Sequence, residues 1–349
     1  MTIPLSTSAV DAARPVRRFS SDSPLSELAA EALTERAAAM LSHLPAVRLG
    51  RDREAVHDMR VAYRRLAAAM AVFRACFPDG RFAALERRAR RVTRSLGKVR
   101  DQDVLLDWFE GEPGSAAEEE QAAVEYVVAV CAEARERFRQ PMLADLERLR
   151  RFDLPSALER YLRREAVDRQ ARRLGIWISN PPLEEETVAE AARRCLGARC
   201  DAAARWAVPA EQPAAEEAQH ALRIAVKRLR YSAELFAPAF PRRLRSFLNA
   251  LKKLQTALGD LHDCDVRRAL LPRLARKPLS PEALWDAGLL RGAPVRRGLE
   301  ILVAAEERRR ARLCGEFLRL WEDLGGARFI VRWRARIAEP RETERGGVA

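Results

Sequence analysis

Two stretches of this sequence repeat one another, and together they decide the fold. The first stretch reads His57-Asp-Met-Arg60-Val-Ala-Tyr-Arg64-Arg65-Leu66. The second stretch reads His220-Ala-Leu-Arg223-Ile-Ala-Val-Lys227-Arg228-Leu229. Both copies continue to a phenylalanine and then a proline at a constant offset of 163 positions, as Phe73 and Pro78 and as Phe236 and Pro241. A constant offset over so many matching positions indicates an internal repeat.

A second pair of matching segments follows in the same order. Leu96-Gly97-Lys98-Val99-Arg100-Asp101-Gln102-Asp103-Val104 matches Leu258-Gly259-Asp260-Leu261-His262-Asp263-Cys264-Asp265-Val266 at an offset of 162 positions. A weaker third echo pairs Arg135 and Arg139 with Arg308 and Arg312. Ordered matches whose offset slips by only one residue predict a duplicated domain.

The sequence around these repeats is typical of an all-α protein. Apolar residues recur three and four positions apart, and alternating β-branched runs are almost absent. Each half has room for about four helices, so we predict two four-helix bundles related by pseudo-two-fold symmetry. The break at Asn180-Pro181-Pro182 sets the boundary between a first bundle, 25–180, and a second, 181–338. We expect flexible tails at 1–24 and 339–349, and a further break from Pro272 to Pro294.

The charge of the chain predicts an anionic partner. Its 349 residues contain 63 Lys and Arg against 50 Asp and Glu, a formal net charge of +13. Most of these cations are arginines, whose planar guanidinium can donate two parallel hydrogen bonds to a phosphate. The apolar stretches are shorter than the roughly 20 residues that span a bilayer, and no signal peptide is evident, so we expect a cytoplasmic protein. Its six cysteines show no paired metal or redox spacing.

The basic residues of both repeats fall on narrow helical arcs opposite the apolar residues. In the first repeat the basic arc holds His57, Arg60 and Arg64. In the second repeat it holds His220, Arg223, Lys227 and Arg230. A further row precedes and includes the first Leu-Gly segment, with Arg87, Arg91, Arg94 and Lys98. The equivalent second-half row keeps Lys253 but has Asn249, Thr256 and Asp260, which predicts weaker anion binding there.

Basic residues on helices are usually a solvated face that pairs with nearby glutamates, and this account suffices for any one arginine. The whole set is better explained by an anion site, because the arcs recur in both halves and concentrate like charges. The candidate polyphosphate-binding residues also include Lys253 and the four arginines of the third echo: Arg135, Arg139, Arg308 and Arg312. If the bundles face each other, the two arcs could line one shared groove that fits a linear polyphosphate. Binding there should weaken steeply with salt.

The repeated Asp-x-Asp pairs allow two interpretations. Asp101 and Asp103, with their copies Asp263 and Asp265, could bind a metal. We prefer a structural role, in which they cap the start of a helix and brace neighbouring arginines. The glycine before each pair would allow a turn or a close helix contact. His57 and His220 lack partners at metal-ligand spacing and are predicted to donate hydrogen bonds to the anion instead.

The repeated motifs resemble the CHAD family, the conserved histidine α-helical domain, over roughly residues 25 to 338. This resemblance implies two four-helix bundles, a basic central channel that binds inorganic polyphosphate, and association with polyphosphate granules. Many relatives carry a CYTH triphosphatase domain ahead of this one, and the chain resembles a stand-alone version. No cofactor and no enzymatic activity are expected, because nucleotide-binding and nucleophile motifs are absent from the sequence.

Two other classes stay open. A nucleic-acid-binding protein would use the same groove, although the aromatic content of 6% offers few rings for stacking unpaired bases. An enzyme or metal protein would be built on His262, Asp263, Cys264 and Asp265.

Overall fold

The computed structural model describes residues 19–50, 52–111, 117–173, 185–276, 280–289 and 293–339. Regular structure in these ranges is helical, apart from one isolated bridge between Pro24 and Thr187. The predicted all-α class is therefore confirmed. Most of the two predicted tails and the predicted boundary at Asn180-Pro181-Pro182 lie outside the described residues.

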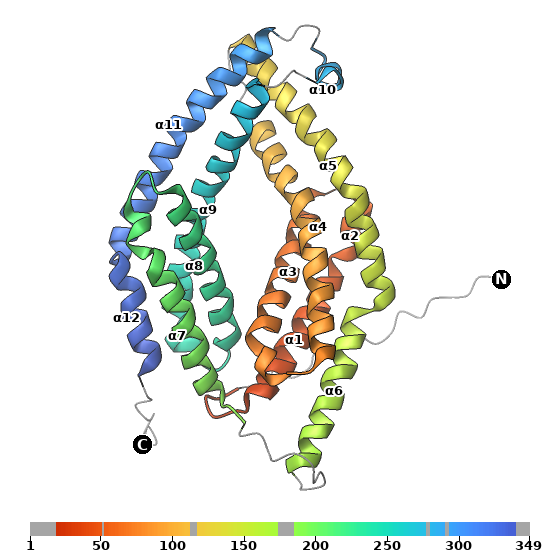
Figure 1. Ribbon diagram of the computed structural model, residues 1–349, viewed down its shortest axis with the longest axis vertical. Helices are drawn as coiled ribbons and strands as arrows, with labels where there is room; N and C mark the ends of the chain where they lie inside the picture. The colour runs from red at the N-terminus through yellow and green to blue at the C-terminus, as the bar shows by residue number, and fades with distance from the viewer. Residues whose placement is uncertain are drawn as a thin grey trace, which may run out of the picture.

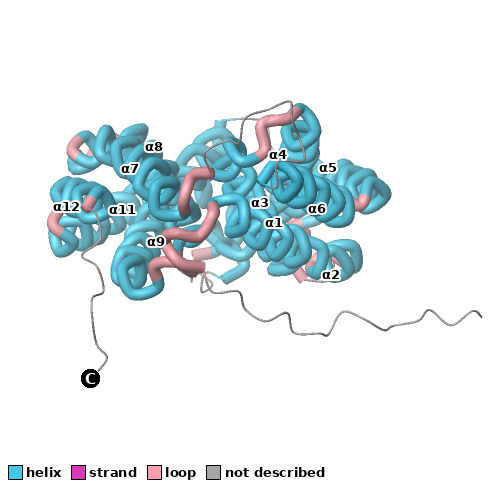
Figure 2. Tube along the Cα trace, turned by 90° about the horizontal axis from the view of Figure 1, so that it is seen from below, coloured by secondary structure: helices cyan, strands magenta, loops and turns pink. Residues whose placement is uncertain are grey.

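Each half contains five helices of twelve residues or more within the described ranges, rather than the four expected. The first half consists of α1 (Leu25–Ser42), α2 (Leu44–Leu49), α3 (Arg53–Val72), η1 (Phe73–Cys76), α4 (Gly80–Gly111), α5 (Glu118–Phe152) and α6 (Leu154–Arg173). The second half consists of α7 (Val188–Ala207), η2 (Pro209–Glu211), α8 (Glu216–Phe236), α9 (Pro241–Arg276), α10 (Pro281–Asp286), α11 (Ala293–Leu324) and α12 (Ala327–Ala338). The two halves lie side by side, as the end-on view of Figure 2 shows.

The repeated stretches meet at the centre of the molecule. They lie on α3 and α8, which contact each other, and the Leu-Gly segments lie on α4 and α9 (Figure 1). Phe73 and Phe236 occupy equivalent positions in the repeat, and their rings touch edge to face with centroids 6.4 Å apart. A residue that contacts its own counterpart lies beside a two-fold axis. This contact is what the predicted pseudo-symmetry requires.

Two apolar clusters hold the halves together. The larger one runs through both halves and includes the fully buried Tyr63, Phe73, Phe236 and Phe247. The smaller one lies where α5 and α11 meet at the top of Figure 1 and includes Phe109, Tyr126, Leu271, Val295 and Leu299. Both clusters bury residues of the first and second halves in one interior. The large side chains in them supply most of the favourable free energy of association between the halves.

Two cation–π contacts add to the upper contact between the halves. The guanidinium groups of Arg267 and Arg309 lie 3.7 and 4.2 Å from the ring centroid of Trp108 on α4. The Arg267 guanidinium is also paired with Glu306, at 3.0 Å, and both side chains are almost fully buried. A buried ion pair of this kind fixes the register of α9 against α11.

Several helix boundaries follow local sequence rules. The Asp52 side chain accepts a hydrogen bond of 2.8 Å from the Glu54 amide and caps α3. Thr187 and Glu190 form a capping box at the start of α7. Gly50 adopts a left-handed conformation, φ 69°, and ends α2. These contacts satisfy backbone groups that a helix end leaves unpaired.

Two predictions about helix ends were wrong. The Asp-x-Asp pairs do not cap helices, because α4 and α9 run straight through Gly97 and Gly259. A glycine at an internal helical position destabilises the helix by about 1 kcal/mol relative to alanine. The buried leucines Leu96 and Leu258 just before these glycines offset that cost. Similarly, α9 continues through Pro272 to Arg276, because the fully buried Leu271 anchors this turn in the smaller apolar cluster.

Candidate anion-binding site

The basic arcs of α3 and α8 are positioned by the apolar arcs behind them. Met59, Tyr63 and Leu66 of α3 are fully buried, as are Leu222 and Leu229 of α8. Since a helix turns by 100° per residue, the arginines between these positions must emerge on the opposite face. The contact between α3 and α8 at the centre then brings the two basic faces together.

Four arginines of these arcs form one group, which we call the central arginine cluster: Arg60, Arg64, Arg223 and Arg230. Burial lowers the pKa of Arg64 to about 10, and the positive charges of Arg60, Arg223 and Arg230 contribute to this decrease. The pKa of Arg223 is lowered by burial and by the charge of Arg60. Cations from both halves therefore lie close enough to repel one another, as the sequence predicted for these four residues.

Carboxylates offset part of this charge. Arg60 pairs with Asp101 at 3.4 Å, and Arg230 pairs with Glu234 at 3.1 Å. Arg64 and Arg223 form no ion pair with any carboxylate in the described part of the chain, although the charge of Asp263 acts on Arg223. Two of the four guanidinium groups thus have no direct counterion among the residues that the structure describes.

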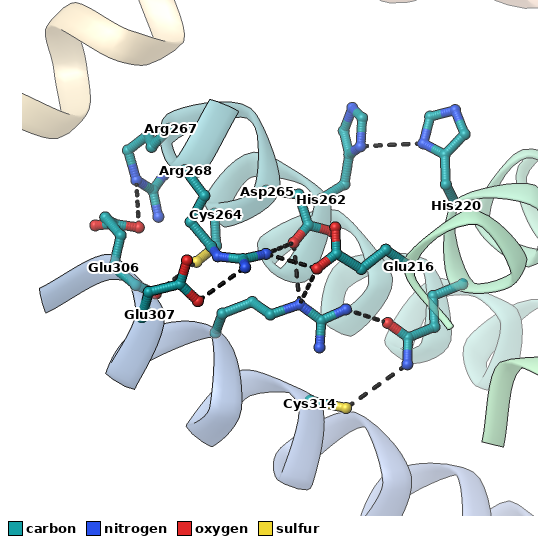
Figure 3. Close-up of polar contacts among 12 residues, drawn as sticks. Glu216, His220, His262, Cys264, Asp265, Arg267, Arg268, Glu306, Glu307 and Cys314 are labelled. Atoms are coloured by element: carbon teal, nitrogen blue, oxygen red, sulfur yellow. Dashed lines mark hydrogen bonds and ion pairs between the residues drawn. The ribbon is translucent and has the colours of Figure 1, made fainter. Parts of the chain in front are cut away.

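A pair of imidazoles borders the cluster on the second half. His220 Nδ1 and His262 Nδ1 are 3.1 Å apart, and the ring centroids are separated by 4.7 Å (Figure 3). Burial, the charge of Arg223 and the His220 ring together lower the pKa of His262 to about 4. This imidazole is therefore neutral at pH 7.

His57, the first-half counterpart of His220, lies in different surroundings. Its side chain is half-buried, and its ligand atoms lie within 4.8 Å of those of Glu54 and Asp58. The expectation that His57 has no carboxylate nearby at metal-ligand spacing was therefore wrong, because the residues three before and one after it turn toward the same side. Lys227, the remaining predicted residue of the second arc, is half-buried.

The second aspartate of each Asp-x-Asp pair braces arginines, as predicted. Asp103 is fully buried and bonds to Arg135 of α5. Asp265 pairs with Arg268 at 3.2 Å (Figure 3). It also pairs with the buried Arg310 of α11 at 3.1 Å. Arg310 of the second half therefore pairs with Asp265 as Arg135 of the first half pairs with Asp103.

The other residues of the third echo do not meet the central cluster by any contact we observe among the described residues. Arg308 and Arg312 are exposed on α11, and Arg312 pairs with Glu316 at 3.7 Å. Arg139 pairs with Glu136 at 3.7 Å and donates to the Arg48 carbonyl at 3.4 Å. The weak similarity had aligned Arg135 with Arg308, whereas the ion pairs align it with Arg310.

The predicted row on α4 is a separate surface on the side of α5. All four residues are exposed: Arg87, Arg91, Arg94 and Lys98. Arg91 reaches Asp145 of α5 at 3.3 Å, and the Lys98 ammonium lies 5.6 Å from the Phe138 ring centroid. This row therefore flanks the central cluster instead of joining it.

The corresponding row on α9 is mixed in charge. Lys253 is exposed and lines a hollow of about 700 Å³ with Asn249, Thr256, Asp260 and Glu316. Burial raises the pKa of Asp260, and the charges of Asp263 and Glu316 raise it further. That this row binds anions more weakly than the row on α4 stays a prediction.

The four residues of the alternative metal site turn in different directions. His262 faces His220, and Cys264 donates to the Glu306 carbonyl at 3.5 Å. Asp265 is held by arginines, and Asp263 lies in the field of Arg223. These side chains do not converge on one point, so the geometry gives the metal interpretation no support.

Sequence reasoning missed two cations near the cluster, Arg100 and Arg267. Both lie close enough to Asp263 to stabilise its ionised form, while burial raises the pKa of that carboxyl. Arg100 also pairs with Asp107 at 3.1 Å and with Glu54 at 3.4 Å. The signal for Arg100 was its place beside Asp101 in the repeated segment.

Comparison with known proteins gave consistent matches. The family model described as CHAD domain matches residues 31–272. The crystal structure of the CHAD domain from the plant Ricinus communis is similar, with a TM-score of 0.62 and 24% identity, over 87% of this chain and 94% of that one. PptA from Streptomyces chartreusis is similar with a TM-score of 0.57 and 17% identity, over 86% and 100%. Curated protein sequences gave no match. No helix among the described residues is long and apolar enough to cross a membrane.

Proposed function

Since this chain belongs to the CHAD domain family, we propose that it binds inorganic polyphosphate at the central arginine cluster. The observation that carries this proposal is the meeting of Arg60 and Arg64 with Arg223 and Arg230, which come from opposite halves of the chain. Their mutual repulsion decreases when a multiply charged anion binds, so the cluster favours a ligand that carries several phosphates close together.

The side chains of the cluster suit phosphate oxygens. Each guanidinium can donate two parallel hydrogen bonds, and Arg64 and Arg223 have no carboxylate partner among the described residues to displace. Partial burial strengthens these hydrogen bonds, because the effective dielectric constant is lower inside the protein than in bulk water.

Nucleic acid fits this site less well. Proteins that bind a single strand combine a basic groove with exposed aromatic rings on which the bases stack. Among the described residues, the ring that lies under cations of the cluster is that of Tyr231, which is 8% exposed. Arg64 and Arg230 lie over its ring, at 5.9 and 5.4 Å from the centroid. That ring is thus already occupied by the cations.

The exposed row on α4 extends the proposed site. From Arg87 to Lys98 it covers about 16 Å of helix at 1.5 Å per residue. A long polyphosphate that occupies the central cluster would continue along this row, whereas the mixed charges on α9 offer no equivalent path. In this proposal the protein is a binding protein without catalysis, associated with polyphosphate granules.

A double charge reversal tests the site. Arg60→Glu with Arg223→Glu should reduce polyphosphate affinity by at least about 100-fold, since each charge-assisted contact contributes about 1.5–3 kcal/mol. The slope of log affinity against log salt should fall by about 2. The matched control is Arg242→Glu with Arg245→Glu, which reverses two exposed charges at the start of α9 and should change affinity less than about threefold.

Circular dichroism establishes that both variants keep their helices. A folded Arg60→Glu, Arg223→Glu protein with unchanged affinity would contradict the proposed site. Competition completes the test: polyphosphate should displace an oligonucleotide at a far lower phosphate concentration, and the reverse order would favour a nucleic-acid-binding protein.

A further inference from the structure

The imidazole pair breaks the symmetry between the two halves of the proposed site. In the repeat, His220 corresponds to His57, and His262 corresponds to Arg100. The first half therefore has a permanently charged guanidinium where the second half has an imidazole, which can gain or lose a proton. The two halves consequently differ in how their charge responds to pH.

The geometry limits the charge that the pair can hold. With the two Nδ1 atoms 3.1 Å apart, one nitrogen donates a hydrogen and the other must accept it. Protonating both rings would place two N–H groups against each other. In this arrangement the pair therefore carries at most one positive charge.

The charged groups around the pair come from four helices. On α8, Arg223 adds positive charge, while the Glu216 carboxylate is turned away toward Arg268, 2.8 Å from it (Figure 3). On α9 the neighbouring carboxyl is Asp263, on α3 the cation is Arg60, and on α4 the carboxylate is Asp101. The groups that act directly on His262 are Arg223 and His220, and both disfavour its protonation.

We propose that His262, together with His220, is a proton-dependent binding residue for polyphosphate, so that binding takes up a proton and affinity rises as pH falls. This inference rests on the proposed function. A phosphate chain bound to Arg223 outweighs the positive charge that disfavours a proton on His262, so the local field becomes negative. Its oxygens also accept hydrogen bonds from both rings. His262 can then take up a proton, and the two rings turn from each other toward the anion.

The thermodynamic linkage between proton uptake and polyphosphate binding sets how strongly the affinity depends on pH. If one proton is taken up, affinity increases by up to about tenfold for each unit of decreasing pH. The window lies between the pKa of His262 in the free protein, about 4, and its value in the complex. Arg100 contributes nothing to this dependence, because it remains charged throughout.

Proton uptake can be measured directly by calorimetric titration with long-chain polyphosphate. Binding heats in two buffers with different ionisation enthalpies, at pH 5.5 and pH 8, give the number of protons bound. The proteins compared are the wild type, His262→Asn, His262→Arg and the distant control His43→Asn. Protonation of the terminal phosphates is common to all four and cancels in the comparison.

We expect the wild type and His43→Asn to take up about half a proton or more beyond His262→Asn at pH 5.5, with no difference at pH 8. The His262→Arg variant has an arginine at this position, as the first half has at Arg100. It should therefore bind polyphosphate at pH 8 about as tightly as the wild type does at pH 5.5, without extra proton uptake. Equal uptake by the wild type and His262→Asn would overturn the inference while polyphosphate binding itself stands. Absence of binding at both pH values would overturn the proposed function as well.

Discussion

The close crossing of α5 and α11 can be tested by adding a single methyl group. A Cβ built on Gly298 of α11 would lie 1.8 Å from the Glu119 carbonyl oxygen and 2.7 Å from the Ala123 Cβ. The Glu119 atom belongs to the backbone of α5, so no side chain can rotate to relieve this overlap. The two helices must separate by more than about 1 Å, which opens the smaller apolar cluster.

Gly315 provides a matched control in the same helix, because nothing lies within 4 Å of a Cβ built there. Gly315→Ala should stabilise the protein by about 0.5–1 kcal/mol, the intrinsic helix preference of alanine over glycine. Gly298→Ala gains the same preference but is overpacked against a backbone. The overpacking costs about 1–3 kcal/mol or more, so we expect a net loss of up to about 2 kcal/mol.

Thermal unfolding followed by calorimetry measures both variants. Gly298→Ala should lower Tm by up to about 3 °C, and Gly315→Ala should raise it by about 1 °C. The opposite signs are the decisive feature, because helix propensity alone predicts an increase in both. A Gly298→Ala protein as stable as Gly315→Ala would refute the close approach of the two helices.

Three other predictions concern ion pairs and titration. Glu306→Gln should lower the free energy of unfolding by about 3 kcal/mol in denaturant titrations, because Arg267 stays buried without its counterion; a loss below about 1 kcal/mol would show that the pair is solvated. Thermal stability should decrease as pH falls from about 6.5 toward 4, because the unfolded chain binds a proton at His262 that the folded protein does not. His262→Asn should flatten that part of the curve, and an identical curve would contradict the lowered pKa. Arg87→Gln with Arg94→Gln should weaken long polyphosphate by about tenfold but leave tripolyphosphate nearly unchanged, measured by titration; equal losses for both lengths would argue against an extended path on α4.

Much of the local structure was predictable. The 3.6-residue periodicity of the apolar residues predicted the helices, and the constant offset between the repeats assigned equivalent roles to α3 and α8. The pattern also assigned Arg60 and Arg223 to the basic arcs opposite the apolar residues, because that assignment depends only on the angular position of a residue about its own helix axis.

The partners of these side chains were not predictable in the same way. Periodicity says which face of a helix is polar but not which distant helix covers that face. Arg135 and Arg139 looked equivalent to members of the basic arcs, yet Arg135 is bound by Asp103, and the row on α4 faces α5. Gly97 and Gly259 resembled helix ends, and only the packing on either side keeps those helices continuous.

The sequence by itself determined that this chain is helical, that it is duplicated, and that its cations lie on defined stripes, since these properties arise from short-range spacing. The tertiary structure decided which stripes meet, which arginines find no counterion within the described part of the chain, and that His220 contacts His262, a residue 42 positions away. Those outcomes depend on how two large apolar clusters bring remote helices together. The free energy of that packing is shared by the whole interior and cannot be read from any single segment.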